Sequence, residues 1–422
     1  MIFNLVYLIF LLISAPYFII SIIRRDKHRI GLLQKFSFVL PTVKTENNIW
    51  IHAVSVGEVL LCRPLVAKLK KTNPDFNIVI SVTTATGYRM AQKHFTEHNL
   101  IFYPFDFTWS VKRILKKINP KIILLAELEL WPNFIMTAKK MNIPVAIING
   151  RLTHRSCLGF KRAIKILKPM FDGVDYFWMQ TNLYADRLRL LGIDDAKIKK
   201  LGSMKYDNLD YTPKNDKIKN ITSALNNYPK RIILVAGSTH SPEETYLLNA
   251  LKPLIKQKKL TLIIAPRHPE RYNEVESMII NQKINCIRKT QLDKNQKYIE
   301  NSIILLDTIG ELSQVYGLSD SVYIGGTLID HGGQNLMEPA ALGKAIICGP
   351  SIYNFQETYN LLQRAGAIIN VKDEQELILE CQQNLLNRDL QSIGKLGVEV
   401  MRAQAGSTQK HCDAILKILQ NA

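Results

Sequence analysis

The sequence lacks the cysteine patterns that mark disulfide-rich and zinc-binding proteins. Its six cysteines form no C-x-x-C pair and show no regular spacing: Cys62, Cys157, Cys286, Cys348, Cys381 and Cys412. We therefore expect free thiols in a reducing compartment and no metal site. Internal repeats and low-complexity tracts are also missing. With 47% hydrophobic and 22% charged residues, the chain of 422 residues is expected to form two globular domains.

Acidic residues are scarce relative to basic ones. Lys and Arg total 55 against 36 Asp and Glu, so the formal net charge is +19. Such a surplus favours an anionic partner. Nucleic acid is disfavoured, because the sequence contains no recognition-helix pattern and no aromatic RNA-binding signature. A membrane surface or a phosphorylated substrate fits the surplus better.

Charged residues are absent from residues 2–23, a run long enough to span the hydrocarbon core of a bilayer. A basic cluster over residues 24–29 follows directly, which predicts that the rest of the chain lies in the cytoplasm. We therefore predict a single-pass membrane anchor over residues 1–24. A cleavable signal peptide is the alternative, but it would require a basic start. Pro16 could also bend the segment into a hairpin within the membrane plane.

From residue 48 onward, short β-branched runs alternate with longer amphipathic stretches, which predicts parallel, doubly wound α/β sheets. A polar, turn-rich stretch at 206–216 divides two such series, giving domains over 25–208 and 209–422. A closing helix is expected over 398–420 and is a candidate to pack back on the first domain. Strands are expected at 49–53, 78–82, 100–103, 121–126, 145–149 and 176–179, and then at 231–236, 260–265, 303–307, 321–325 and 344–348.

Three motifs follow expected strands of the first half, where such folds place their ligands. In HAVSVGE, residues 52–58, Gly57 lets the backbone approach a ligand closely. Glu58 lies in a first helical turn, where it is a candidate proton acceptor or an ordinary helix-starting acid. In ELELWPN, residues 127–133, Glu127 and Glu129 leave a buried strand and require a partner or a function. Arg151 after the next strand is either an anion clamp or a salt-bridged loop residue.

In the second half, GSTHSPEE at residues 237–244 combines possible ligand donors with a helix start. Ser241 and Glu244 match a capping box with Pro242 at the first helical position, which leaves Gly237, Ser238 and Thr239 as backbone and hydroxyl donors. The next strand ends in PRHPER, residues 266–271, where Arg267 and His268 suit a phosphate or nucleotide. A single histidine there is weak evidence for catalysis or metal binding.

The densest pattern is GGTLIDHGGQNLMEP, residues 325–339. Two glycine pairs flank a polar loop that opens into a helix, so its free amides are expected to bind a diphosphate or phosphodiester. The spacing matches neither Walker A nor G-x-G-x-x-G, which excludes a P-loop kinase and a dinucleotide-binding dehydrogenase. A purely structural glycine turn is the alternative. The residues of interest are Gly325, Gly326, Gly332, Gly333, Gln334, Asn335 and Glu338.

Taken in order along nearly the whole chain, these motifs closely resemble those of the Kdo transferases, lipopolysaccharide enzymes that add 3-deoxy-D-manno-octulosonic acid (Kdo) to lipid A. The resemblance implies a GT-B fold of two Rossmann-like domains, with the acceptor domain first and the nucleotide-sugar domain second. It implies an inverting transfer of Kdo from CMP-Kdo to a lipid A precursor, lipid IVA, at the cytoplasmic face of the inner membrane.

The resemblance also implies roles for individual residues. Glu58 would be the general base, and one or both of Glu127 and Glu129 would support it, while Ser55, Gly57 and Arg151 would contact the acceptor or an anion. The donor would be held by Gly237, Ser238, Thr239, Arg267, His268, Asn335, Glu338 and the glycine loop. No cofactor and no metal are expected, because a helix N-terminus and Arg267 can stabilise the leaving CMP.

Two other functions fit parts of this pattern. Another membrane-associated GT-B enzyme, using a UDP-sugar in envelope synthesis, would release UDP instead of CMP. A non-catalytic binding protein on the same scaffold would not need both Glu58 and the glycine loop, yet both are present.

Overall fold

The computed structural model describes residues 3–9, 12–14, 31–44, 46–214 and 216–420. The chain divides into two compact units. The N-terminal unit comprises Met1–Asn208 and Gln404–Ala422, and the C-terminal unit comprises Leu209–Ala403. The first residues of the expected linker are structured, because Met204–Asn208 form the short helix η3 with Tyr206 buried.

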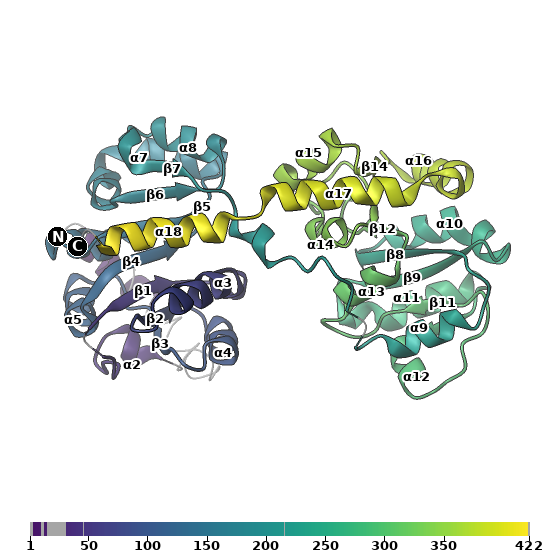
Figure 1. Ribbon diagram of the computed structural model, residues 1–422, viewed down its shortest axis with the longest axis horizontal. Helices are drawn as coiled ribbons and strands as arrows, with labels where there is room; N and C mark the ends of the chain where they lie inside the picture. The colour runs from purple at the N-terminus through teal and green to yellow at the C-terminus, as the bar shows by residue number, and fades with distance from the viewer. Residues whose placement is uncertain (1–2, 10–11, 15–30, 45, 215, 421–422) are drawn as a thin grey trace. The chain divides into compact units, whose positions relative to one another are not determined.

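The N-terminal unit is built on a seven-stranded parallel sheet in the order β3-β2-β1-β4-β5-β6-β7 (Figure 1). Its strands are β1 (Asn48–His52), β2 (Asn77–Val82), β3 (Asn99–Phe102), β4 (Pro120–Ala126), β5 (Val145–Gly150), β6 (Tyr176–Met179) and β7 (Ile198–Lys200). Its helices include α2 (Leu32–Lys35), α3 (Val56–Thr72), α4 (Ala85–His94), α5 (Thr108–Ile118), α6 (Pro132–Lys140), α7 (His154–Gly173), α8 (Asn182–Arg189), η2 (Asp195–Lys197) and α18 (Ser407–Gln420).

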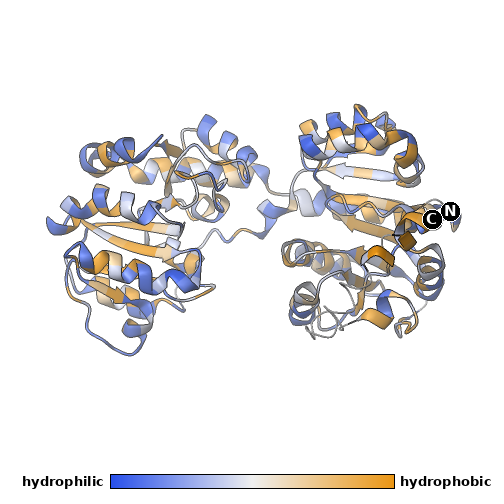
Figure 2. Ribbon diagram, turned by 180° about the vertical axis from the view of Figure 1, so that it is seen from behind, coloured by the Kyte–Doolittle hydropathy of each residue, from blue (hydrophilic) through white to orange (hydrophobic). Residues whose placement is uncertain are grey.

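Helices cover both faces of this sheet, as its sequence pattern requires. Along β4, Ile123 and Leu125 join one hydrophobic cluster, and Ile122 and Leu124 join a second cluster on the opposite face. The first cluster is completed by side chains of α5, α6, α7 and α8, and the second by α3, α4 and α18. Strands buried on both faces read as continuous apolar runs, which is why the central strands could be predicted from the sequence. Figure 2 shows these strands as hydrophobic ribbons between helices of mixed hydropathy.

The C-terminal unit repeats this architecture with a second seven-stranded parallel sheet, in the order β10-β11-β9-β8-β12-β13-β14. Its strands are β8 (Ile232–Thr239), β9 (Leu260–Pro266), β10 (Cys286–Arg288), β11 (Ile303–Leu305), β12 (Ser321–Ile324), β13 (Ala345–Cys348) and β14 (Ile368–Asn370). Its helices are α9 (Lys219–Asn226), α10 (Glu243–Lys256), η4 (Pro269–Arg271), α11 (Tyr272–Asn281), α12 (Lys289–Asp293), α13 (Leu312–Leu318), α14 (Met337–Ala341), α15 (Gln356–Arg364), α16 (Glu374–Leu379), η5 (Glu380–Asn384), η6 (Leu385–Asn387) and α17 (Leu390–Gln404). The predicted α/β class with two parallel sheets is confirmed.

The sequence did not predict β7, β10 and β14. Each is three residues long, and β7, β10 and β14 all lie at a sheet edge. So short a strand shows no period of its own, and an edge strand is only partly covered, so its apolar signal is weak.

The expectation of one closing helix over 398–420 is wrong. The structure has two helices, α17 and α18, separated at Gly406, whose φ of 96° lies outside the helical region. In α18, Cys412 and Ile415 are buried against the N-terminal sheet, and His411 Nε2 accepts a hydrogen bond of 3.1 Å from the Asn149 amide. The chain therefore ends in the unit in which it began.

The predicted anchor over residues 1–24 is described only in part, because residues 1–2, 10–11 and 15–24 lie outside the described residues. Residues 3–9 are helical, and Asn4 bonds to Thr108 and Asn133 of the N-terminal unit. Within the described ranges, no helix is long and apolar enough to cross a membrane.

Candidate functional site

The predicted site residues of the N-terminal unit all follow neighbouring strands. The loops after β1, β4 and β5 carry Glu58, Glu127 with Glu129, and Arg151, and these three strands are adjacent in the sheet. Because the strands are parallel, their carboxyl ends meet at one edge, where open α/β sheets bind ligands. The structure thus brings the first three motifs together.

Glu58 lies in the first turn of α3, and Ser55 is the N-cap residue of that helix. The Ser55 hydroxyl accepts from the Glu58 amide at 3.3 Å and donates to Glu58 Oε1 at 2.8 Å, while the Val54 amide donates to Oε2 at 2.8 Å. Burial raises the pKa of Glu58, hydrogen bonds from Val54 and Ser55 oppose the rise, and the charge of Glu127 adds to it. Glu58 is therefore both a helix-starting acid and a carboxylate of increased basicity.

The two acids of the second motif have different surroundings. Glu127 has a left-handed backbone, with φ 56°, and its Oε1 lies 3.1 Å from Nζ of Lys205. Glu129 has no ion-pair partner in the part of the chain that the structure describes. Burial and the charge of Glu58 raise the pKa of Glu129. The carboxylates of Glu58, Glu127 and Glu129 are thus close enough to affect one another's pKa. Among the described residues, the one lysine paired with any of them is Lys205, which contacts Glu127.

Sequence reasoning missed Lys205 because it lies on η3, away from any predicted strand end. The amide of its neighbour Met204 donates to Asn149 Oδ1 at 2.9 Å, so the exit of β5 holds η3 in place. Asn149 of the third motif is therefore structural. Arg151, by contrast, has no ion pair among the described residues, which argues against a salt-bridged loop arginine and leaves its guanidinium open to an anion.

In the C-terminal unit, the loops after β8, β9 and β12 converge, because these strands are neighbours in the sheet order β9-β8-β12. They bring together three imidazoles, with ring centroids of His240 5.4 Å from His268 and 4.2 Å from His331. Burial, followed by the nearby histidines and arginines, lowers the pKa of His240 to about 4. His240 and His331 were not predicted as site residues, although both stand in motifs that the sequence singled out.

The prediction that the amides of the glycine loop are free for a phosphate is wrong for much of the loop. The amides of Gly326, Thr327 and Leu328 donate to the buried carboxylate of Glu243, at 2.7, 3.0 and 3.2 Å. The Gly332 amide donates to the Ser351 hydroxyl at 2.9 Å, and that of Gly333 donates to the Gly326 carbonyl at 2.8 Å. These five groups are already satisfied within the protein.

The predicted capping box of Ser241 and Glu244 is also wrong. Helix α10 begins at Glu243 and has Pro242 as its N-cap residue, without a side-chain cap. Glu244 is instead fully buried and paired with Arg271, 2.7 Å from Nη1. Glu243 and Glu244 both point into the unit, because Glu243 accepts from loop amides there and Glu244 pairs with Arg271.

The remaining donor-site candidates divide into structural and available groups. Gly325 is structural, since a Cβ there would lie 2.1 Å from the Ser238 carbonyl oxygen. Asn335 links to Glu338 at 2.9 Å, and burial raises the pKa of Glu338. Gln334 Nε2 lies 3.4 Å from His240 Nε2. Arg267 is exposed and has no ion pair with a described residue.

Other parts of the same edge are close to these groups. Thr239 is buried, and within the described ranges its hydroxyl has no hydrogen-bond partner. Gly237 and Ser238 directly precede Thr239 at the carboxyl end of strand β8. No group of three or more His, Cys, Asp or Glu among the described residues could hold a metal ion.

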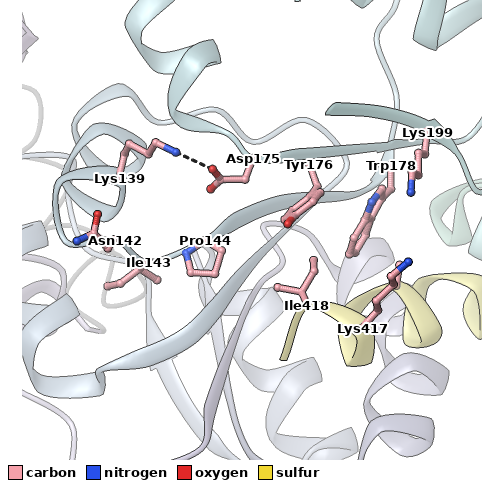
Figure 3. A pocket seen from close by; sticks show the side chains of 11 residues that line it. Lys139, Asn142, Ile143, Pro144, Asp175, Tyr176, Trp178, Lys199, Lys417 and Ile418 are labelled. Atoms are coloured by element: carbon pink, nitrogen blue, oxygen red, sulfur yellow. Dashed lines mark hydrogen bonds and ion pairs between the residues drawn. The ribbon is translucent and has the colours of Figure 1, made fainter. Parts of the chain in front are cut away.

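A cavity of about 510 Å³ lies elsewhere in the N-terminal unit (Figure 3). It is lined at the amino ends of β5 and β6 by Pro144 and Asp175, and by Lys417 of α18. Asp175 is engaged by Lys139 at 2.7 Å. The cavity is therefore at the edge of the sheet opposite to the three carboxylates, and it contains none of the predicted site residues.

Comparison with known proteins gives a consistent result. Residues 25–208 match the family model described as 3-deoxy-D-manno-octulosonic-acid transferase. A 3-deoxy-D-manno-octulosonic acid transferase of Haemophilus influenzae is 31% identical over 97% of both chains, and one of Chlamydophila psittaci is 28% identical over 84% of this chain and 82% of its own. A bifunctional glycosyltransferase/methyltransferase of Fusobacterium nucleatum is 32% identical over 86% of this chain and 57% of its own.

Solved structures match at the level of the fold. A glycosyltransferase from Rickettsia africae superposes with a TM-score of 0.60 and 17% identity, covering 90% of this chain and all of its own. A UDP-GlcNAc 2-epimerase from Neisseria meningitidis gives a TM-score of 0.61 and 13% identity, covering 89% of this chain and all of its own.

Proposed function

Because the chain belongs to the family of 3-deoxy-D-manno-octulosonic acid transferases, an identification carried by 31% identity over nearly its full length, we propose that it moves Kdo from CMP-Kdo to a lipid A precursor, lipid IVA. It is a glycosyltransferase of lipopolysaccharide biosynthesis. The acceptor, the donor nucleotide, the inverting course and the role of each residue are the proposed elements.

The observation that carries the mechanism is Glu58 at the carboxyl edge of the N-terminal sheet. In the proposed step, an acceptor sugar hydroxyl attacks the anomeric carbon of Kdo as the bond from that carbon to the CMP phosphate oxygen breaks. The electron pair of that bond leaves with the phosphate oxygen, and Glu58 takes the hydroxyl proton. A single displacement of this kind inverts the anomeric centre.

The surroundings of Glu58 support this role. A carboxylate whose pKa is raised by burial and by Glu127 holds a proton more strongly than an exposed acid, so it is a better base. Its hydrogen bonds to Ser55 and Val54 fix the side chain, which reduces the cost of orienting it. Glu129 is the second candidate base, since its pKa is also raised.

On the donor side, we infer that side chains rather than loop amides stabilise the leaving CMP. Arg267 offers a guanidinium without an ion pair among the described residues, and the imidazoles of His240 and His331 lie within one loop cluster, where they can donate hydrogen bonds. The proposed reaction uses no metal. Asn335 and Glu338 remain the candidates for contacts to ribose or base.

The proposed location is the cytoplasmic face of the inner membrane, with residues 1–24 as the anchor. In the described part of that segment, Leu5, Val6, Leu8 and Ile9 are 47% to 57% exposed. Apolar side chains left open to solvent in this way favour contact with a lipid surface. The net charge of +19 favours an anionic leaflet and a phosphorylated acceptor.

The test is transfer to tetraacylated lipid A precursor in detergent with a chelator present. CMP-Kdo would be made beforehand and separated from the enzyme and metal ions used to make it, and UDP-sugars would be offered in parallel. We expect CMP release and a product carrying Kdo in the inverted configuration. Transfer from UDP-sugars alone would overturn the donor assignment, and loss of activity in the chelator would overturn metal independence.

A further inference from the structure

Glu243 is a carboxylate that is fully buried yet has no ion pair with any described residue. It receives five hydrogen bonds instead. The Tyr323 hydroxyl and the amides of Thr327 and Leu328 donate to Oε1 at 2.8, 3.0 and 3.2 Å, and the amides of Gly326 and His240 donate to Oε2 at 2.7 and 3.1 Å. Such a buried anion is costly unless it is fully hydrogen-bonded.

Both oxygens of Glu243 act as acceptors in these contacts. Four of the five donors are backbone amides, which can only donate. The fifth is the phenol of Tyr323, whose pKa is raised by burial and by the charge of Glu243, so it keeps the proton that it donates. The arrangement therefore matches the hydrogen-bonding capacity of a carboxylate.

Glu243 joins two of the loops that meet at the donor edge. It binds the turn at Gly326–Leu328 after β12 and the backbone of His240 after β8. Three loop amides consequently point inward, away from any ligand. The imidazoles of His240 and His331 are presented at the same time, with ring centroids 4.2 Å apart and Gln334 beside them.

We propose that Glu243 is a positioning residue for the donor: its buried carboxylate fixes the glycine loop and His240 in the arrangement that binds the CMP group. This inference rests on the proposed function. It assigns the geometry of the glycine loop to an internal anion rather than to a bound phosphate. Glu243 itself touches no substrate.

The test compares Glu243→Gln with Glu244→Gln. Both positions are fully buried at the start of α10, but Glu244 is held by Arg271 and contacts no loop amide. In Glu243→Gln, the new amide group opposes backbone donors, so the loop loses charge-assisted hydrogen bonds. We expect the Kd of CMP, measured by calorimetry, and the KM for CMP-Kdo to rise about tenfold or more.

The turnover number and the KM for the lipid acceptor should stay within about threefold in Glu243→Gln, and Glu244→Gln should bind CMP like the native protein. A merely structural role predicts a different result, in which both variants weaken CMP binding equally. That result, or native CMP affinity in Glu243→Gln, would overturn the proposal.

Hydrogen exchange supplies a readout that does not depend on transfer. Deuterium uptake over residues 325–334 should increase in Glu243→Gln and not in Glu244→Gln.

If Glu243→Gln failed to fold, Tyr323→Phe would remove one of the five donors while keeping the charge. A smaller rise in the Kd of CMP, about threefold, is then expected. Unchanged CMP affinity and unchanged uptake in that variant would refute the inference. A native protein that transferred no Kdo would refute the proposed function, while CMP binding and exchange would still decide the role of Glu243.

Discussion

Glu58 and Glu243 lie in the first turns of the helices that follow the first strands of the N-terminal and C-terminal units, and their environments are opposite. Glu58 is half-buried and hydrogen-bonded to Ser55 and Val54, and its pKa is raised by burial and by the charge of Glu127. Glu243 is fully buried and saturated by five donors. The same residue at the same place in two sheets of one kind can thus exchange a proton or hold a loop, and the donors around it decide which.

The difference extends to the groups around each glutamate. The N-terminal edge collects carboxylates, whereas the C-terminal edge collects imidazoles and an unpaired arginine. Burial favours the neutral form in both, raising the pKa of Glu58 and Glu129 and lowering that of His240. From this contrast we propose proton acceptance on the first edge and anion binding on the second.

The largest expected effect comes from removing the charge of Glu58. Glu58→Gln keeps one side-chain oxygen that can accept from the Val54 amide but cannot take a proton. We expect the turnover number to fall by about 10²-fold to 10⁴-fold with the KM for CMP-Kdo unchanged. Steady-state kinetics on both substrates checks this, and thermal unfolding should show a melting temperature within about 3 °C of the native protein.

Arg267→Ala tests the carboxyl edge of the C-terminal sheet, where we propose that the donor binds. In the proposed complex, the Arg267 guanidinium contacts the phosphate of the donor, so its loss should raise the KM for CMP-Kdo by roughly 10-fold to 100-fold. Arg267→Lys restores the charge without the paired hydrogen bonds, so it should recover part of the loss. Donor titrations at two ionic strengths make the measurement. An Arg267→Ala variant with native donor KM would contradict the assignment of this edge to the donor.

Glu127→Gln should shift the pH dependence of transfer. Activity requires ionised Glu58, so it declines as the pH falls through the pKa of that group. The charge of Glu127 raises this pKa, and its removal therefore moves the acid limb of kcat/KM to lower pH. Lys205→Met leaves the Glu127 charge unpaired and should move the limb to higher pH. If the acid limb of kcat/KM lay at the same pH in the native protein, Glu127→Gln and Lys205→Met, the charge of Glu127 would not affect the pKa of the catalytic base.

The smallest expected effect is a difference in the free energy of unfolding between substitutions at the start of α3 and the start of α10. Ser55→Ala removes a hydroxyl that accepts from the Glu58 amide, so the free energy of unfolding should fall by about 1 kcal/mol. Ser241→Ala removes an exposed hydroxyl that caps nothing, so its effect should stay within about 0.5 kcal/mol. Urea unfolding of both variants provides the comparison.

The central strands and the strand-end motifs could be predicted, since β-branched runs buried on both faces are visible in the sequence and site residues follow them. The short edge strands β7, β10 and β14 could not. Ser241 and Glu244 matched a capping box in spacing, yet Glu244 is drawn to Arg271, and spacing alone contains no information about such distant partners. His240 and His331 meet only because β8 and β12 are neighbours in the sheet.

Lys205 illustrates the same limit on the acceptor side. It reaches Glu127 from a short helix whose place is set by a hydrogen bond between Met204 and Asn149, separated by 55 residues. Local patterns predicted the acids at 127 and 129, but not the cation that distinguishes them. The ion pair makes Glu129, rather than Glu127, the acid without a cationic partner among the described residues.

The most direct test of the account is a single-turnover measurement. Native protein and Glu58→Gln would be saturated with CMP-Kdo, mixed with tetraacylated lipid A precursor and quenched at intervals, with CMP affinity measured on the same preparations. The account predicts equal CMP affinity and a transfer rate constant at least about a hundredfold lower in Glu58→Gln. Equal rate constants in the two proteins would contradict the assignment of Glu58 as the proton acceptor.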